Sequence, residues 1–457
     1  MTKLLNHINT YESEADYQND NSKNFPNVSY IVENVNVLFE VIRYEQQYFA
    51  IESLEDDNAI MFKLSSDSGS PSASSAKTIS VSTDDGGTWT DYTSTADGTT
   101  IATLNMGQKV LIRGNNNTYV GSGFRRGFSC FTASKQIDVN GNIMSLIYGD
   151  NFKEQYSFPG GTNYNFQNIF NSAPIVSAEN LILPATTLAK SCYENMFEGC
   201  TSLTTAPKLP ATTLAKSCYE NMFYGTNVLP DCTNIDFTSK AVLDSGGLIG
   251  LFAGTKVTDS DLDRLLPKNT NGKYYLPATT LANYCYADMF RDCTNLVTAP
   301  DLPATTLANG CYENMFYGCR NLVTAPDLPA TTLANYCYHS MFYGCTSMTS
   351  APSLLPATTL ADNCYQSMFQ RCTSLTTAPT LPAKTLASDC YWDMFAGCTS
   401  LNYIKCLATD ISANGCLSTW VNGVAASGTF VKNSAATWNV TGANGVPTGW
   451  TIQKASS

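Results

Sequence analysis

The sequence predicts an α/β solenoid of 26-residue coils, each with a short strand and a short helix, preceded by a small all-β domain and an N-terminal arm. Three observations support this prediction. The heptad Leu-Pro-Ala-Thr-Thr-Leu-Ala recurs through the second half of the 457-residue chain, and a Cys-Tyr-x-x-Met-Phe block follows each copy. The region before residue 150 lacks both patterns and alternates apolar and polar residues instead.

The repeats define the solenoid at residues 151–425. The heptads start 26, 67, 26, 26, 27 and 26 residues apart, at Leu183, Leu209, Leu276, Leu302, Leu328, Leu355 and Leu381. The last copy has Lys384 in place of a threonine. A fixed period of this length indicates coils that bury their apolar residues against their neighbours. The 67-residue step predicts a degenerate insert at about 226–275, and residues 426–457 are expected to form a C-terminal cap.

Within a coil, the Cys block has helical spacing. Cys311, Met315 and Cys319 lie at i, i+4 and i+8, which predicts one buried stripe of a short helix ending near Gly318. The following segment, 322–326, reads as a short strand that ends at a proline.

Positions that vary between coils are expected to face water, because a stacked ladder tolerates any residue there. We therefore select Asp301, Asp327, Ser353 and Thr380 as candidate partner-binding residues, and we add Tyr317 and Tyr343, which belong to a row of tyrosines that could form an aromatic platform. The threonine ladders are either a surface for a regular polymer or ordinary polar strand and turn residues. The recurring tyrosine after the first cysteine is either an aromatic platform for glycans or part of the core.

The coils resemble the BspA-like leucine-rich repeat family, whose pattern runs Ala-Phe-x-x-Cys-x-x-Leu, a strand and then Ile-Pro. Here the segment from Met315 to Leu322 and the pair Leu328-Pro329 occupy those places. The resemblance covers roughly residues 165–425, although the 26-residue period is longer than is usual in that family. It implies an α/β leucine-rich-repeat solenoid that is displayed on a surface and used in adhesion.

Residues 1–45 are predicted to form a docking arm. The first 60 residues carry 11 acidic and three basic side chains, and this imbalance suits either a complementary partner or a solvated face. The stretch from Lys3 to His7 and a Pro-Asn-Val-Ser segment resemble the N-termini of virion proteins of crAss-like gut bacteriophages. The resemblance implies docking on the virion, for which the candidates are Phe25, Pro26, Val28 and Tyr30.

Residues 46–150 are predicted to form a β-sandwich-like domain. Residues 78–82 alternate apolar and polar side chains, Asp85-Gly86-Gly87 supplies a turn, and 88–92 returns as a second strand. The segment Ser82–Trp89 resembles the Asp-box of sialidase propellers. In those proteins the box is a hairpin element outside the active site and recurs from blade to blade, whereas here it occurs once. A structural hairpin is therefore preferred over a sialidase.

The 17 cysteines are predicted to form buried thiol ladders. Their eight-residue pairs lack the Cys-x-x-Cys spacing of zinc sites, so a metal is the least favoured reading, and disulfides between coils are the second. No metal or other cofactor is predicted. With two histidines and no recurring acid, base or nucleophile set, the sequence also predicts that the chain is not an enzyme.

The composition of the chain also limits the classes of partner that it can bind. Charged residues make up 14% of the chain, and the net charge is -12, which disfavours nucleic acid. No apolar run reaches membrane-spanning length, and no signal peptide is visible. We therefore expect a non-enzymatic virion structural protein at the virion surface, either a head fibre, a decoration protein or a tail fibre. It would be a homo-oligomer that docks on capsid or tail proteins and presents its solenoid to a host-surface protein or glycan. The alternative is a BspA-like adhesin of the bacterial cell surface.

Overall fold

The computed structural model describes residues 47–66, 75–121, 127–229 and 246–455, together with Ile235, Val242 and Asp244. The predicted docking residues Phe25, Pro26, Val28 and Tyr30 lie outside these ranges. Residues 45–457 form one compact unit. Its strands are β1 (Phe49–Ser53), β2 (Asn58–Ser66), β3 (Thr78–Ser82), β4 (Thr90–Thr93), β5 (Thr99–Leu104), β6 (Lys109–Gly114), β7 (Gly127–Ala133), β8 (Ile137–Asn142), β9 (Ile175–Ser177), β10 (Leu181–Ile182), β11 (Tyr403–Cys406), β12 (Thr429–Lys432) and β13 (Thr451–Lys454).

The front of this unit is built from antiparallel strands. One sheet has the order β10-β8-β1-β6-β3-β4, with β9 also paired to β8, and a second has the order β5-β2-β7. The predicted hairpin is present, because β3 pairs with β4 in antiparallel register. Its Asp84 carboxylate accepts hydrogen bonds from the hydroxyls of Ser82 (2.7 Å) and Thr88 (2.8 Å), which hold its pKa at about 2. The Asp-box is thus bonded within its own loop.

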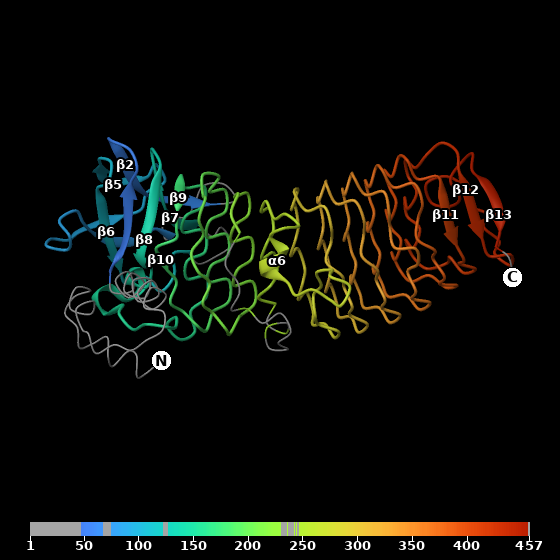
Figure 1. The fold of residues 1–457 in the computed structure, drawn as a ribbon, viewed down its shortest axis with the longest axis horizontal. Helices are drawn as coiled ribbons and strands as arrows, with labels where there is room; N and C mark the ends of the chain where they lie inside the picture. The colour runs from blue at the N-terminus through green and yellow to red at the C-terminus, as the bar shows by residue number, and fades with distance from the viewer. Residues whose placement is uncertain are drawn as a thin grey trace, which may run out of the picture. The chain divides into compact units, whose positions relative to one another are not determined.

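Strand β8 joins the antiparallel part to the coils. It pairs antiparallel with β1 on one side and parallel with β9 and β10, which belong to the first coils, on the other. The buried side chains form one continuous core from Phe49 to Trp450. Figure 1 shows the coils stacked side by side after this junction, up to the parallel strands β11, β12 and β13.

The coils are not α/β units, and the predicted helix in each Cys block is wrong. The described α-helices, α4 (Ser145–Tyr148) and α6 (Leu262–Leu265), and the 3₁₀ turn η2 (Gly149–Asn151) all lie outside those blocks. Each block is instead a chain of tight turns, which we call the turn ribbon. The predicted strand at 322–326 is reduced to single bridges such as Thr298 to Thr324.

Left-handed residues explain why the block cannot be helical. Gly310, Asn314 and Gly318 have φ values of 59°, 53° and 71°, whereas an α-helix needs φ near -60°. Each is the third residue of a turn closed by a backbone bond from the fourth residue to the first, as in a type II turn. These bonds are Cys311 N–H to Ala308 C=O (3.2 Å), Met315 to Tyr312 (3.3 Å) and Cys319 to Phe316 (3.1 Å).

Every second backbone N–H of the block bonds to the next coil rather than to its own coil. Within this block the N–H groups of Tyr312, Asn314 and Phe316 donate to carbonyls 25 residues further along the chain, at 3.0, 2.9 and 2.9 Å. A helix would have used those donors internally. The ribbon therefore alternates bonds within a coil and bonds between coils, and it turns pairs of side chains inward every four residues.

The inward pairs fill the core with stacked columns. The tyrosine of each block is at most 1% exposed, so these rings are core and not a glycan platform: Tyr193, Tyr219, Tyr286, Tyr312, Tyr338, Tyr365 and Tyr391. Neighbouring rings stack, as in Tyr338 and Tyr365 at 5.7 Å between centroids. The hydroxyls of Tyr193 and Tyr312 are buried without a hydrogen-bond partner, so the expectation that the hydroxyls lie at the surface fails there.

The C-terminal end is closed by tryptophans. The Trp420 indole is fully buried and donates to the carbonyl of Gly445 at 2.9 Å. Trp438 donates to Ala408 at 3.0 Å and Trp450 to Ala425 at 2.7 Å. These hydrogen bonds connect the C-terminal segment to the last coils, and the buried tryptophan rings cover the end of the core.

Candidate functional site

The turn ribbon presents pairs of outward side chains between its buried pairs. In the coils from 283 to 392 these positions hold amides, aromatic rings and a few charges. We call nine of them the outer face: Asn283, Tyr284, Asn309, Glu313, Asn335, Tyr336, His339, Gln366 and Trp392. Corresponding positions of earlier coils carry Lys190, Lys216, Glu194 and Glu220. The outer face thus has no counterpart of Lys190 and Lys216.

Three aromatic rings of the outer face are exposed to solvent. Tyr284, Tyr336 and Trp392 are 40%, 39% and 40% exposed. A side chain at Gly310, between the two tyrosines, would start 2.3 Å from the ring of Tyr284, so the glycine leaves room for that ring to lie over the next coil. Tyr336 packs edge-on against His339 at 5.8 Å.

The two tyrosines selected from the sequence lie beside this surface. The rings of Tyr317 and Tyr343 stack with centroids 4.4 Å apart and planes 1° from parallel. The Arg291 guanidinium lies 5.1 Å from the Tyr317 ring and the Arg371 guanidinium 5.7 Å from the Tyr343 ring. The ring faces are therefore occupied by each other and by cations, which leaves ring edges and hydroxyls for a partner.

The other four candidates belong to a different segment of the coil. Asp327 and Ser353 are exposed, as expected, but Asp301 and Thr380 are half-buried, which corrects the prediction for these two. The Asp301 carboxylate accepts a hydrogen bond from the Asn269 amide at 2.8 Å. The structure thus divides the six residues between two places instead of bringing them together.

One contact on the outer face has the atoms of a hydrolase triad. His339 Nδ1 lies 3.2 Å from a Glu313 carboxylate oxygen, and its Nε2 lies 3.4 Å from the Ser340 hydroxyl. However, Ser340 is 6% exposed, and its backbone N–H donates to Gln366. The next N–H, of Met341, donates to Tyr338, so neither can stabilise an oxyanion. The arrangement fits a contact between neighbouring coils better than an acyl-transfer site.

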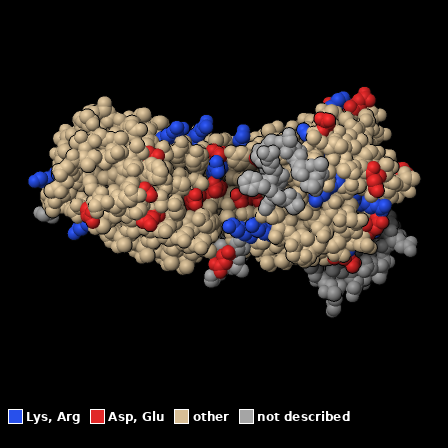
Figure 2. All heavy atoms as spheres, turned by 180° about the vertical axis from the view of Figure 1, so that it is seen from behind, with Lys and Arg blue, Asp and Glu red and all other residues tan. Residues whose placement is uncertain are grey.

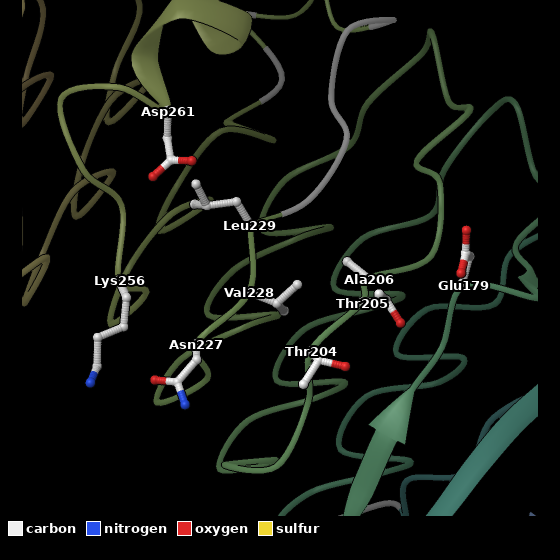
Figure 3. Close-up of a pocket in the computed structure, with 9 residues that line it drawn as sticks. All are labelled: Glu179, Thr204, Thr205, Ala206, Asn227, Val228, Leu229, Lys256 and Asp261. Carbon is white, nitrogen blue, oxygen red and sulfur yellow. The ribbon is translucent and has the colours of Figure 1, made fainter.

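A pocket of about 380 Å³ lies where the insert, represented by Lys256 and Asp261, meets the coil segments 204–206 and 227–229. Figure 3 shows its lining spread over neighbouring segments: Glu179, Thr204, Thr205, Ala206, Asn227, Val228, Leu229, Lys256 and Asp261. The Asp261 carboxylate accepts bonds from the N–H and the hydroxyl of Thr258, at 2.9 and 2.6 Å. The lining combines hydroxyls, an amide, carboxylates and an ammonium with the apolar side chains of Ala206, Val228 and Leu229, which suits a small molecule with both polar and apolar parts.

Most of the cysteines form two columns in the core. Sixteen of the 17 lie in the described part of the chain, where all are buried and free of disulfides. Burial raises the pKa of the Cys218, Cys293 and Cys398 thiols to about 12. Such thiols are protonated and unreactive at neutral pH. Among the described residues, no group of three or more His, Cys, Asp or Glu side chains is placed to hold a metal ion.

The face drawn in Figure 2 is mostly uncharged, in keeping with the low content of charged residues. Within the described ranges, no helix has the length and apolarity needed to cross a bilayer.

No protein-family model, curated protein or solved structure matches the chain.

Sequence reasoning missed Tyr284, Tyr336 and Trp392. The useful signal was the four-residue spacing of Gly, Asn, Asp and Ser at most left-handed positions, which separates inward from outward residues, although Tyr284 and Tyr336 themselves occupy such positions. A helical reading of the same block assigns the wrong side chains to the surface.

Proposed function

We propose that this chain is a non-enzymatic structural protein of a bacteriophage particle, a head fibre, decoration protein or tail fibre. It would dock through its N-terminal arm and present the stacked coils to a host-surface protein or glycan. The observation that carries the proposal is the single core that runs from Phe49, through every coil, to Trp450. Such a core makes the coils a firm scaffold on which weak contacts can be repeated, and several copies on one particle would add avidity.

The resemblance of residues 1–45 to crAss-like virion proteins supports the particle over a cell envelope. A second candidate, a BspA-like adhesin of the bacterial surface, is favoured by the coil pattern of Met315 to Leu322. Both candidates use the coils in the same way and differ in what holds the other end of the chain.

Mass spectrometry on purified phage particles and on membrane fractions of the host separates the two. We expect peptides of this chain in the particle at a fixed ratio to the capsid protein. Deletion of residues 1–45 should abolish incorporation while leaving the thermal unfolding of the remaining chain intact. Peptides confined to the bacterial envelope would refute the virion proposal and favour the adhesin.

A further inference from the structure

We propose that the outer face binds a neutral, linear glycan that runs across successive coils. This inference rests on the proposed function, since it names the class of molecule that the displayed coils would recognise. It assigns the contact to Tyr284, Tyr336 and Trp392, with the neighbouring amides as hydrogen-bond partners.

The exposed rings supply the apolar part of the site. A pyranose ring has C–H groups on its faces, which pack against flat aromatic surfaces, and Tyr and Trp combine such a surface with a polar group. Tyr284 and Tyr336 occupy the same place in coils two apart, which at ~4.8 Å per coil is about 10 Å. Trp392 follows two coils later, in the adjacent column of outward residues. The rings therefore recur along the direction in which the coils stack, as a chain-like ligand requires.

Amide side chains supply the polar part. Asn283, Asn309 and Asn335 are exposed and occupy equivalent places in three consecutive coils. The side-chain amide oxygen of Asn283 accepts a hydrogen bond from the backbone N–H of Asn309 at 3.1 Å, which fixes the Asn283 side chain along the column. Amides both donate and accept, and so match sugar hydroxyls, which do the same.

Charge selects a neutral glycan over an acidic one. The net charge is -12, and the outer face itself carries the carboxylate of Glu313 but no lysine or arginine. The adjacent Arg291 and Arg371 are engaged on the rings of Tyr317 and Tyr343. A sulfated or sialylated chain would face the Glu313 carboxylate, with no lysine or arginine of the outer face to offset the repulsion.

A protein partner fits this surface less well. The exposed rings are separated by Gly310 and by asparagines, so they do not form the contiguous apolar patch that stable protein interfaces bury at their centre.

The test uses the full-length protein on arrays of neutral oligosaccharides (glucans, mannans, galactans and N-acetylglucosamine oligomers) and of sialylated and sulfated glycans. We expect binding to at least one neutral series, with affinity that increases with chain length. Tyr284→Ala, Tyr336→Ala and Trp392→Ala should each weaken it about tenfold. Tyr156→Ala is the matched control, because Tyr156 is 49% exposed but lies outside the outer face.

Three results would overturn the inference: no binding to any neutral series, binding to acidic glycans alone, or binding that the three ring variants leave unchanged. Thermal unfolding of each variant shows that it is folded. Detection of the chain in phage particles does not depend on glycan binding. A virion protein without glycan affinity would therefore refute the inference alone, whereas glycan affinity in a chain absent from particles would refute the virion proposal alone.

Discussion

The thiol of Cys319 lies 3.0 Å from the carbonyl oxygen of Phe290, one coil earlier. The same bond recurs at five other coils, between Cys200 and Phe170, Cys293 and Phe252, Cys345 and Phe316, Cys372 and Phe342, and Cys398 and Phe369. Where the column holds Thr226 or Thr255, the hydroxyl donates to the phenylalanine carbonyl of its own coil, at 2.8 or 2.7 Å. This position therefore calls for a small side chain with a donor.

Substitution of Cys319 should reveal that donor. Thr and Val have the same shape, so we expect Cys319→Thr to be more stable than Cys319→Val by about 1 kcal/mol, the value of one buried hydrogen bond. Urea unfolding of the two variants measures the difference. A valine variant as stable as the threonine variant would show that the thiol acts only by filling space.

Replacement of Gly344 distinguishes a turn ribbon from a helix. Gly344 has φ +71°, and an added Cβ would meet nothing closer than 3.9 Å, so Gly344→Ala isolates the backbone cost. We expect a loss of about 1–2 kcal/mol, whereas in a helix the same change would gain about 1 kcal/mol. Gly344→Asn is the control, because asparagine tolerates this conformation, as Asn314 does here. A stabilising alanine would contradict the ribbon.

Alkaline pH should unfold the protein steeply. The buried thiols keep their protons in the folded chain because burial raises the pKa of groups such as Cys218 to about 12, whereas an unfolded cysteine ionises near ~8.5. The unfolded state therefore releases protons first, and stability falls as pH rises from about 9 towards 12. Each fully buried thiol contributes a loss of about 1.4 kcal/mol per pH unit in that window.

Circular dichroism and thiolate absorbance, followed together from pH 7 to 12, check this expectation. Thiolate should appear only as the fold is lost. Thiolate that forms near pH 9 in a chain with native circular dichroism would contradict the buried columns.

Removal of Trp420 should open the C-terminal end. Trp420→Ala deletes a fully buried ring and leaves the Gly445 carbonyl without its donor, so we expect a loss of about 3–5 kcal/mol. Hydrogen exchange should locate the loss in the last coils. Trp392→Ala, at an exposed position, is the control and should change stability by less than about 0.5 kcal/mol. Equal effects of the two changes would argue against a cap.

The repeat could be read from the sequence, but its local geometry could not be read from apolar spacing alone. Cys311, Met315 and Cys319 are four residues apart, and over two turns a helical stripe of 3.6 residues and a ribbon of four look the same. Gly310, Asn314 and Gly318 decide between them, because left-handed residues recurring every fourth position exclude a helix.

The outer face was less accessible to prediction than the core. Core columns repeat because each residue touches its equivalents in the neighbouring coils. The outward residues do not have to pack against their equivalents in this way, so their identity can change from coil to coil. Tyr284, for example, is replaced by Gly310 one coil later. Asp301 was expected to face water because it varies, yet Asn269, from the insert that interrupts the period, partly covers it. Such contacts arise outside the repeat and leave no periodic signal.

The two ends of the stack are specialised and its middle is not. Strand β8 fixes the first coils and Trp420 closes the last, while the coils between them share nearly the same sequence and the same register. Gene segments that encode nearly identical repeats can recombine in a shifted alignment, and the product then loses or gains whole coils. Each such event would preserve both ends and move everything beyond it by ~4.8 Å. The length of the stack could thus change without redesign of either terminus.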